Sequence, residues 1–253
     1  MRRRSILASC SALSSRPPAA QLGASDVPPS EKVTVDLSLV LATDVSSSID
    51  DDEALLQRQG YRAALTDPVV LNLVAAGPHA AIGVAYVEWS GMAFQRLLLP
   101  WTRIASAADA LAWSAALARQ PLAPLGSRRG TSISRGIAFS LRLLGDAPWT
   151  ATRQVVDICG DGVNNNGGPV EDLRDSAVAR GVTLNGLVIE GSDPNETGVA
   201  PPATLEAYYR NSVIGGPDAF VLAVAGFDEF AGAIRRKLVR ELASTDPFTG
   251  ADG

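Results

Sequence analysis

The chain has 253 residues, of which 46% are hydrophobic and 19% charged, and its formal net charge at pH 7 is -5. This length suits one well-buried α/β domain, and the hydrophobic content argues against a disordered protein. The acidic balance without a basic stripe argues against a nucleic-acid partner, and no apolar run reaches the roughly 18 residues that a transmembrane segment needs.

Residues 1–31 are predicted to lie outside the fold, because Pro, Ser and Ala dominate them as far as Pro29. Residues 2–4 are arginines followed by a short apolar stretch, which is typical of an export signal but shorter than the roughly seven apolar residues such signals need. Cys10 follows Leu-Ala-Ser, as the lipid-bearing cysteine does in bacterial lipoproteins. We expect a periplasmic or lipid-anchored protein, or a cytoplasmic one if this signal does not function.

From residue 33 onward, apolar runs alternate with helical patterns, which predicts a doubly wound, mostly parallel α/β sheet with helices on both faces. The predicted strands are residues 33–42, 80–89, 94–99, 153–160, 183–189 and 220–225. The predicted helices are residues 51–65, 105–118, 132–144, 170–180 and 228–242. A short turn separates the second and third strands, so we expect an antiparallel pair at the edge of the sheet. We expect one domain over residues 32–244 and a disordered tail over residues 245–253.

The most informative segment follows the first strand, where Asp44, Ser46 and Ser48 are spaced by single residues. A carboxylate and two small hydroxyls on a tight turn match the way oxygen ligands are arranged for a hard divalent cation. The same residues also fit a helix start, because Ser and Asp cap free backbone N–H groups and the acidic run 50–53 suits a first helical turn. Residues further along the chain decide between these interpretations.

The positions of the histidine and the cysteines restrict the kinds of metal site and catalytic site that the chain can form. The single histidine, His79, follows Gly-Pro and is expected to be a solvated turn residue. Zinc sites of the Cys/His kind and catalysis with a histidine base therefore lack their usual parts. Cys159 ends an apolar run and is expected to be buried and inert, without a disulfide to Cys10.

Two later segments bring further oxygen atoms. Thr131 precedes a predicted helix and offers either a third hydroxyl or an N-cap. Asp161 directly follows the strand at residues 153–160, between two glycines that allow close backbone approach, although an ordinary Asp-Gly turn is the alternative. Ligands of open parallel sheets bind outside the carboxyl ends of the strands, so we expect Asp161 and Asp44 to reach one crevice. The asparagines at 164–166 would make a turn or orient metal-bound water.

The pattern Asp44-x-Ser46-x-Ser48, followed by Thr131 and Asp161, resembles the metal-ion-dependent adhesion site of von Willebrand factor type A (vWA) domains. The strings around both aspartates are most similar to a bacterial vWA-like family of unknown function. The resemblance implies a Rossmann-like vWA fold and a Mg2+ or Mn2+ ion held by the three hydroxyls, with the aspartates bound directly or through water. It also implies a non-enzymatic domain that binds an acidic side chain on another protein.

Two alternatives remain open at this point. An Asp that ends the first strand of an α/β sheet can be the nucleophile of a phosphohydrolase, but Ser46 stands where such enzymes place a second acid. Only Lys32 and Lys237 are present to balance phosphoryl charge. The other alternative is a structural scaffold with a vestigial metal site. Elsewhere, we expect Asp157 and Asp193 to take no part in the site. We expect the basic run 235–237 to be solvated. The partner and the oligomeric state are not predicted.

Overall fold

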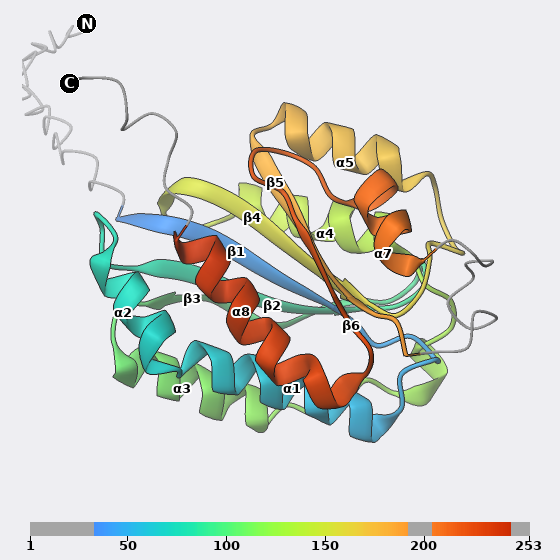
Figure 1. Ribbon diagram of the computed structural model, residues 1–253, viewed down its shortest axis with the longest axis horizontal. Helices are drawn as coiled ribbons and strands as arrows, with labels where there is room; N and C mark the ends of the chain where they lie inside the picture. Colours follow the sequence, from blue (N-terminus) through green and yellow to red (C-terminus); the bar gives the residue numbers. More distant parts are fainter. Residues whose placement is uncertain (1–32, 192–203, 244–253) are drawn as a thin grey trace, which may run out of the picture. The chain divides into compact units, whose positions relative to one another are not determined.

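The computed structural model describes residues 33–191 and 204–243, whose centre is a six-stranded sheet in the order β3-β2-β1-β4-β5-β6 (Figure 1). The strands are β1 (Thr34–Asp44), β2 (Ile82–Trp89), β3 (Gln95–Ile104), β4 (Thr150–Gly160), β5 (Val182–Ile189) and β6 (Val221–Val224). All neighbouring strands are parallel except the β2–β3 pair. The predicted mostly parallel sheet with one antiparallel edge strand is therefore confirmed. The predictions for the leader, Cys10, Asp193 and the tail at residues 245–253 lie outside the described residues.

Helices cover both faces of the sheet, as predicted (Figure 1). One layer contains α1 (Asp51–Leu65), α2 (Pro68–Ala76), α3 (Ala107–Ala118) and α8 (Phe230–Ala243). The other contains α4 (Ile133–Gly145), α5 (Val170–Ala179), α7 (Leu205–Tyr208) and the π-helical turn η2 (Tyr209–Val213). Side chains of β1 alternate between the two apolar cores, with Leu39 and Leu41 on the α1 side and Val40 and Ala42 on the α4 side. None of the helices in the described ranges is both long and apolar enough to span a bilayer.

The start of α1 follows its local sequence signals. Asp50 is the N-cap: its Oδ1 accepts a hydrogen bond from the Glu53 N–H at 2.8 Å, and Glu53 Oε2 accepts one from the Asp50 N–H at 2.9 Å. This capping box satisfies two backbone donors that a helix start leaves free. The predicted helix over residues 51–65 is therefore confirmed.

Several elements differ from the prediction. No helix was predicted between the strands at residues 183–189 and 220–225, where α7 and η2 lie. Helix α2 was not predicted, although Asp67 at its N-cap and Pro68 in its first turn are ordinary helix-start signals. Strand β1 extends two residues further than expected because Asp44 still pairs with Trp89 of β2. Strand β3 continues past Pro100 to Ile104, which is possible because an edge strand tolerates a missing N–H donor.

The expectation that the basic run 235–237 is solvated is wrong for Lys237, which is 1% exposed. Its Nζ donates hydrogen bonds to Asp157 Oδ1 and, at 2.7 Å, to Glu241 Oε1. Asp157, expected to be a bystander, is thus one of two buried carboxylates that pair with this lysine. The ammonium enters the core because these two carboxylates compensate its lost hydration.

Candidate metal centre at the carboxyl end of the sheet

The strand order places the two predicted acidic ligands next to each other. β1 lies between β2 and β4, and the chain winds outward from it in both directions, so the strand order reverses there. Asp44 is the last residue of β1, and Asp161 directly follows Gly160 at the end of β4. Ligands of open α/β sheets bind at such a reversal, outside the carboxyl ends of the strands.

Hydrogen bonds join four of the five predicted ligands. The Ser46 N–H donates to Asp44 Oδ1 at 2.7 Å, which folds the chain into a tight turn after β1. The Ser46 and Ser48 hydroxyl oxygens are 3.2 Å apart. The Ser48 hydroxyl then donates to Asp161 Oδ1 at 3.0 Å. A continuous row of oxygen atoms therefore crosses from the β1 loop to the β4 loop.

Thr131 is fastened to the same β4 loop through its backbone. Its carbonyl oxygen accepts hydrogen bonds from the N–H groups of Asn165 and Asn166 at 3.0 and 3.2 Å. Its own N–H donates to Asn165 Oδ1 at 2.8 Å. The N-cap of α4 is Ser132, so the alternative role of Thr131 as the helix cap is wrong. The structure thus holds the Thr131 segment against the loop that begins at Asp161.

The asparagines at 164–166 have a role that the sequence did not predict. Asn164 Oδ1 accepts from the Ser134 N–H at 3.2 Å, and Asn166 Oδ1 accepts from the Met92 N–H at 3.0 Å. Together with the Asn165 bond to Thr131, they join the β4 loop to the α4 start and to the β2–β3 hairpin. Asparagine suits this task because its side chain replaces a backbone partner in irregular loops. The three consecutive Asn residues were the available signal, but their partners are not visible in the sequence.

Both carboxylates of the site are buried. Asp44 is 0% exposed and Asp161 is 2% exposed, while Ser48 is exposed to solvent. Burial, and next the negative charge of Asp161, raise the pKa of Asp44 well above its usual range. No group among the described residues donates a hydrogen bond to Asp44 Oδ2. A buried carboxylate oxygen in this situation is costly unless a cation or a donor faces it.

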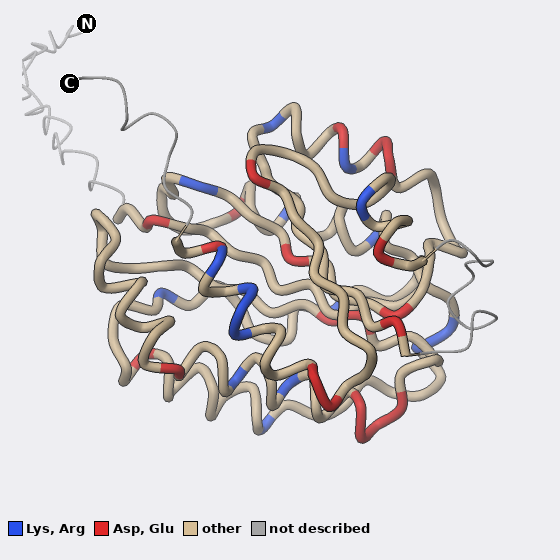
Figure 2. The backbone as a smooth tube through the Cα atoms, in the orientation of Figure 1, with Lys and Arg blue, Asp and Glu red and all other residues tan. Residues whose placement is uncertain are grey.

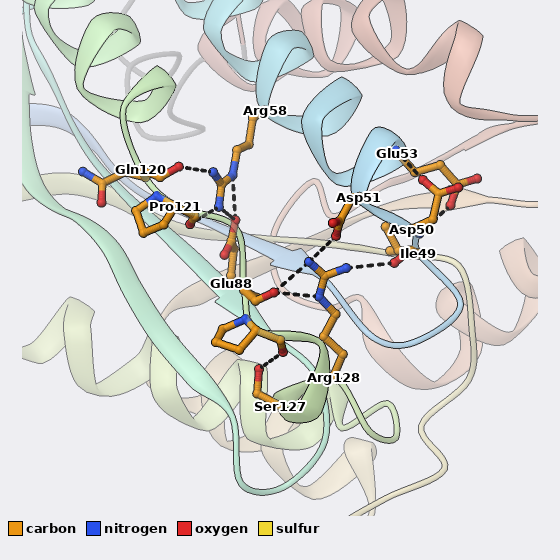
Figure 3. A network of polar contacts seen from close by, with 12 residues as sticks. Ile49, Asp50, Asp51, Glu53, Arg58, Glu88, Gln120, Pro121, Ser127 and Arg128 are labelled. Carbon is orange, nitrogen blue, oxygen red and sulfur yellow. Dashed lines mark hydrogen bonds and ion pairs between the residues drawn. The ribbon is translucent and has the colours of Figure 1, made fainter.

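A guanidinium fastens the site's first loop to the segment that precedes Thr131 (Figure 3). Arg128, which is 2% exposed, donates to the Ala123 carbonyl from Nε at 3.1 Å and from Nη2 at 2.8 Å. Its Nη1 reaches the Ile49 carbonyl at 3.4 Å, and its Nη2 lies 2.7 Å from Asp51 Oδ1. Ile49 and Asp51 directly follow the Ser46–Ser48 turn, so Arg128 holds two loops of the site together.

A group of arginine contacts around Glu88 anchors the start of the loop that leads from the end of α3 to Arg128 (Figure 3). Glu88 Oε1 accepts from Arg58 at 2.8 and 2.5 Å, and Glu88 Oε2 accepts from Arg96 at 2.7 Å. Arg58 also donates to the carbonyls of Gln120 and Pro121 at 2.8 and 3.1 Å. The loop after α3 is thereby tied to β2 and α1 before it reaches Arg128.

Asp and Glu residues are frequent near this end of the sheet, where the acidic start of α1 lies (Figure 2). Across the described parts of the chain, however, no three side chains of the His, Cys, Asp or Glu type gather into a metal-binding group. The candidate set instead combines two carboxylates with three hydroxyls. Such a set leaves zinc without its preferred nitrogen and sulfur ligands and suits a hard cation better.

Comparison with protein families finds one match over most of the chain. The model of a family described as "Protein of unknown function (DUF1194)" matches residues 34–246. No curated protein matches the sequence.

Comparison with solved structures identifies the fold. Proximal thread matrix protein 1 from the mussel byssus, solved with a zinc-occupied MIDAS motif, is 18% identical, with a TM-score of 0.56 over 84% of this chain and 49% of that chain. A von Willebrand factor type A protein from Catenulispora acidiphila is 17% identical, with a TM-score of 0.53 over 84% and 44%. The pilus adhesin SpaC from Lactobacillus rhamnosus GG is 14% identical, with a TM-score of 0.56 over 84% and 31%. The predicted vWA-like fold is confirmed, and the chain spans less than half the length of each of these structures.

Proposed function

The chain belongs to the DUF1194 family and has the vWA fold, and on this basis we propose that it is a non-enzymatic, divalent-metal-dependent protein-binding domain. In this proposal the metal is held by a set of five side chains, namely Asp44, Ser46, Ser48, Thr131 and Asp161. The family description names no activity, so the support for metal-dependent binding comes from the five side chains of the site. The observation that carries the proposal is the buried Oδ2 of Asp44, which lacks a donor in the described structure and belongs to a carboxylate close to that of Asp161.

The donor chemistry fits Mg2+ or Mn2+. Both ions prefer oxygen ligands, and Mg2+ in particular favours six-coordinate geometry and keeps several waters. Hydroxyls supply oxygen without charge, so two carboxylates and three hydroxyls would neutralise a divalent ion without crowding it. The zinc-occupied MIDAS motif of the mussel protein supports a divalent ion in this fold, and the absence of nitrogen and sulfur from the proposed set favours Mg2+ or Mn2+ here.

The partner we propose is a protein that presents an Asp or Glu side chain. The cation, when bound, would supply an electrophilic position that a partner carboxylate can occupy. Ser48 is the exposed member of the hydrogen-bonded row, so the site opens to solvent on its side. The signal-like features of residues 2–10 support a periplasmic or lipid-anchored location for this interaction, with a cytoplasmic location if that signal does not function.

Calorimetric titration of the full chain with MnCl2 and with MgCl2 tests the proposal. Wild type should bind one ion and show a higher melting temperature in its presence, because a ligand that binds only the folded state stabilises it. Asp44→Ala should abolish both effects. The matched control is Asp52→Ala, which removes an exposed carboxylate from the start of α1 and should leave ion binding unchanged.

Three outcomes would contradict the proposal. The first is a wild-type protein that takes up neither ion. The second is turnover of a model phosphate ester that stops in Asp44→Ala, which would favour a phosphohydrolase instead. Retained uptake in Asp44→Ala would move the site away from these residues.

A further inference from the structure

Next to the candidate metal centre lies a tyrosine whose hydroxyl is buried. Tyr209 begins η2, directly after α7, and is 0% exposed. Its hydroxyl has no hydrogen-bond partner within the part of the chain that the structure describes. Burying a hydroxyl without a partner is unfavourable, so a group that accepts a hydrogen bond from it is expected nearby.

The atoms around Gly160 indicate that this group is the Asp44 carboxylate. A Cβ atom built on Gly160 would lie 2.8 Å from the Tyr209 hydroxyl and 3.3 Å from Asp44 Oδ2. Both oxygen atoms therefore face the same side of a residue that has no side chain. These are also the donor and the acceptor that are buried without partners at this point of the structure.

We infer that Tyr209 is a positioning residue for the metal ligand Asp44, and that its hydroxyl is linked to Asp44 Oδ2 by hydrogen bonds through one ordered water. This inference rests on the metal site of the proposed function. Such a bond orients the carboxylate and stabilises its charged form, which is the form that binds a cation. Gly160 keeps the space between the two oxygens open.

The ionisation of the phenol agrees with its role as a donor. Burial, and next the negative charge of Asp44, raise the pKa of Tyr209 well above its usual range, so the hydroxyl keeps its proton. The neighbouring Tyr208 has a different partner: its hydroxyl accepts a hydrogen bond from the Asn164 N–H at 3.2 Å. The same substitution, tyrosine to phenylalanine, can therefore be made at two adjacent positions. Of the two, Tyr209 is the one beside Asp44 in the structure.

Manganese titration of the full chain tests the inference with Tyr209→Phe and Tyr208→Phe. Loss of a hydrogen bond to a metal ligand typically weakens metal binding about 10- to 100-fold, and we expect this for Tyr209→Phe. Tyr208→Phe should change the Kd by no more than about twofold. Gly160→Ala is a second perturbation of the same contact and should also weaken binding, because its Cβ would displace the hydroxyl.

The melting temperature of the chelated proteins separates positioning from a purely structural role. If the hydroxyl serves only packing, Tyr209→Phe changes the melting temperature and leaves the Kd of manganese unchanged, which would overturn the inference. A wild-type Kd in Tyr209→Phe overturns it while the proposed function stands, provided that Asp44→Ala loses binding. Failure of the wild type to bind manganese overturns the proposed function and this inference together.

Discussion

Single residues show two solutions to one physical problem, the burial of carboxylates. Asp157 and Glu241 are buried together, and Lys237 supplies a cation between them. Asp44 and Asp161 are also buried, and the largest influences on the pKa of Asp44 are its burial and the negative charge of Asp161. The first group contains its own cation. The second is the place where a cation from solution would have the largest effect.

Replacing the internal cation gives a prediction at this scale. Lys237→Met should destabilise the protein by about 3–5 kcal/mol at pH 7, because it leaves two carboxylates buried without their cation. Arg236→Met, an exposed change on the same helix, should stay within about 0.5 kcal/mol of wild type. Urea denaturation measures both, and equal stability of the two variants would contradict the prediction.

Lys237 also makes the stability of the protein depend on pH in the alkaline range. Burial alone would lower the pKa of Lys237, but the Asp157 and Glu241 carboxylates outweigh it and raise the pKa above its usual value. The stabilisation is therefore complete below about pH 10.4, the pKa of an unfolded lysine, and is lost as the pH rises through the higher folded value. On the alkaline side, the stability gap between wild type and Lys237→Met should narrow in that range.

At the scale of elements, the candidate site depends on connections between loops. The β4 loop is tied to Thr131 by three hydrogen bonds, and Arg128 ties the segment before Thr131 to the turn after β1. None of these connections lies within one helix or strand. The loops are held by side chains that replace the missing backbone ladder, so their geometry depends on a few polar residues.

Removing Arg128 should therefore disturb both stability and metal binding. Arg128→Met leaves the buried carbonyls of Ala123 and Ile49 without this donor, and we expect a loss of about 2–4 kcal/mol. Manganese affinity should fall as well, since the two loops are no longer held in register. Arg129→Met is the matched control: Arg129 is exposed, and its loss should affect neither quantity. Unchanged stability in Arg128→Met would show that the loops are held by other contacts.

At the scale of the whole molecule, one sheet with two apolar layers accounts for the described chain. Leucine side chains of β1 enter one layer, and Val40 and Ala42 enter the other, so the central strand cannot be removed without exposing each core. We therefore propose residues 32–244 as the folding domain.

A truncated protein tests these boundaries. Residues 32–244 should unfold in a single cooperative transition with the midpoint of the full chain, because every described element lies inside them. Urea denaturation monitored by far-UV and near-UV circular dichroism measures this. Two separate transitions, or a midpoint clearly below that of the full chain, would contradict the proposed domain.

Local sequence signals determined the class of fold, the order of the six strands along the chain and the strand ends that carry Asp44 and Asp161. These features follow from hydrophobic periodicity and helix-start residues, which act over a few neighbouring positions. Helix α2 was missed although Asp67 and Pro68 mark its start, because its mostly apolar sequence lacks a clear polar face. The metal-binding role of the five side chains remains a prediction.

Only the tertiary structure decided the burial of Lys237, the loop connections made by Arg128 and by the asparagines at 164–166, and the approach of Tyr209 to Asp44. Each of these joins residues that are at least four and mostly more than 30 positions apart in the chain. Their partners are selected by where the packed sheet and helices bring the backbone, which no local pattern records. The sequence therefore determined which chemical groups reach the carboxyl end of the sheet, and packing decided which of them are compensated there.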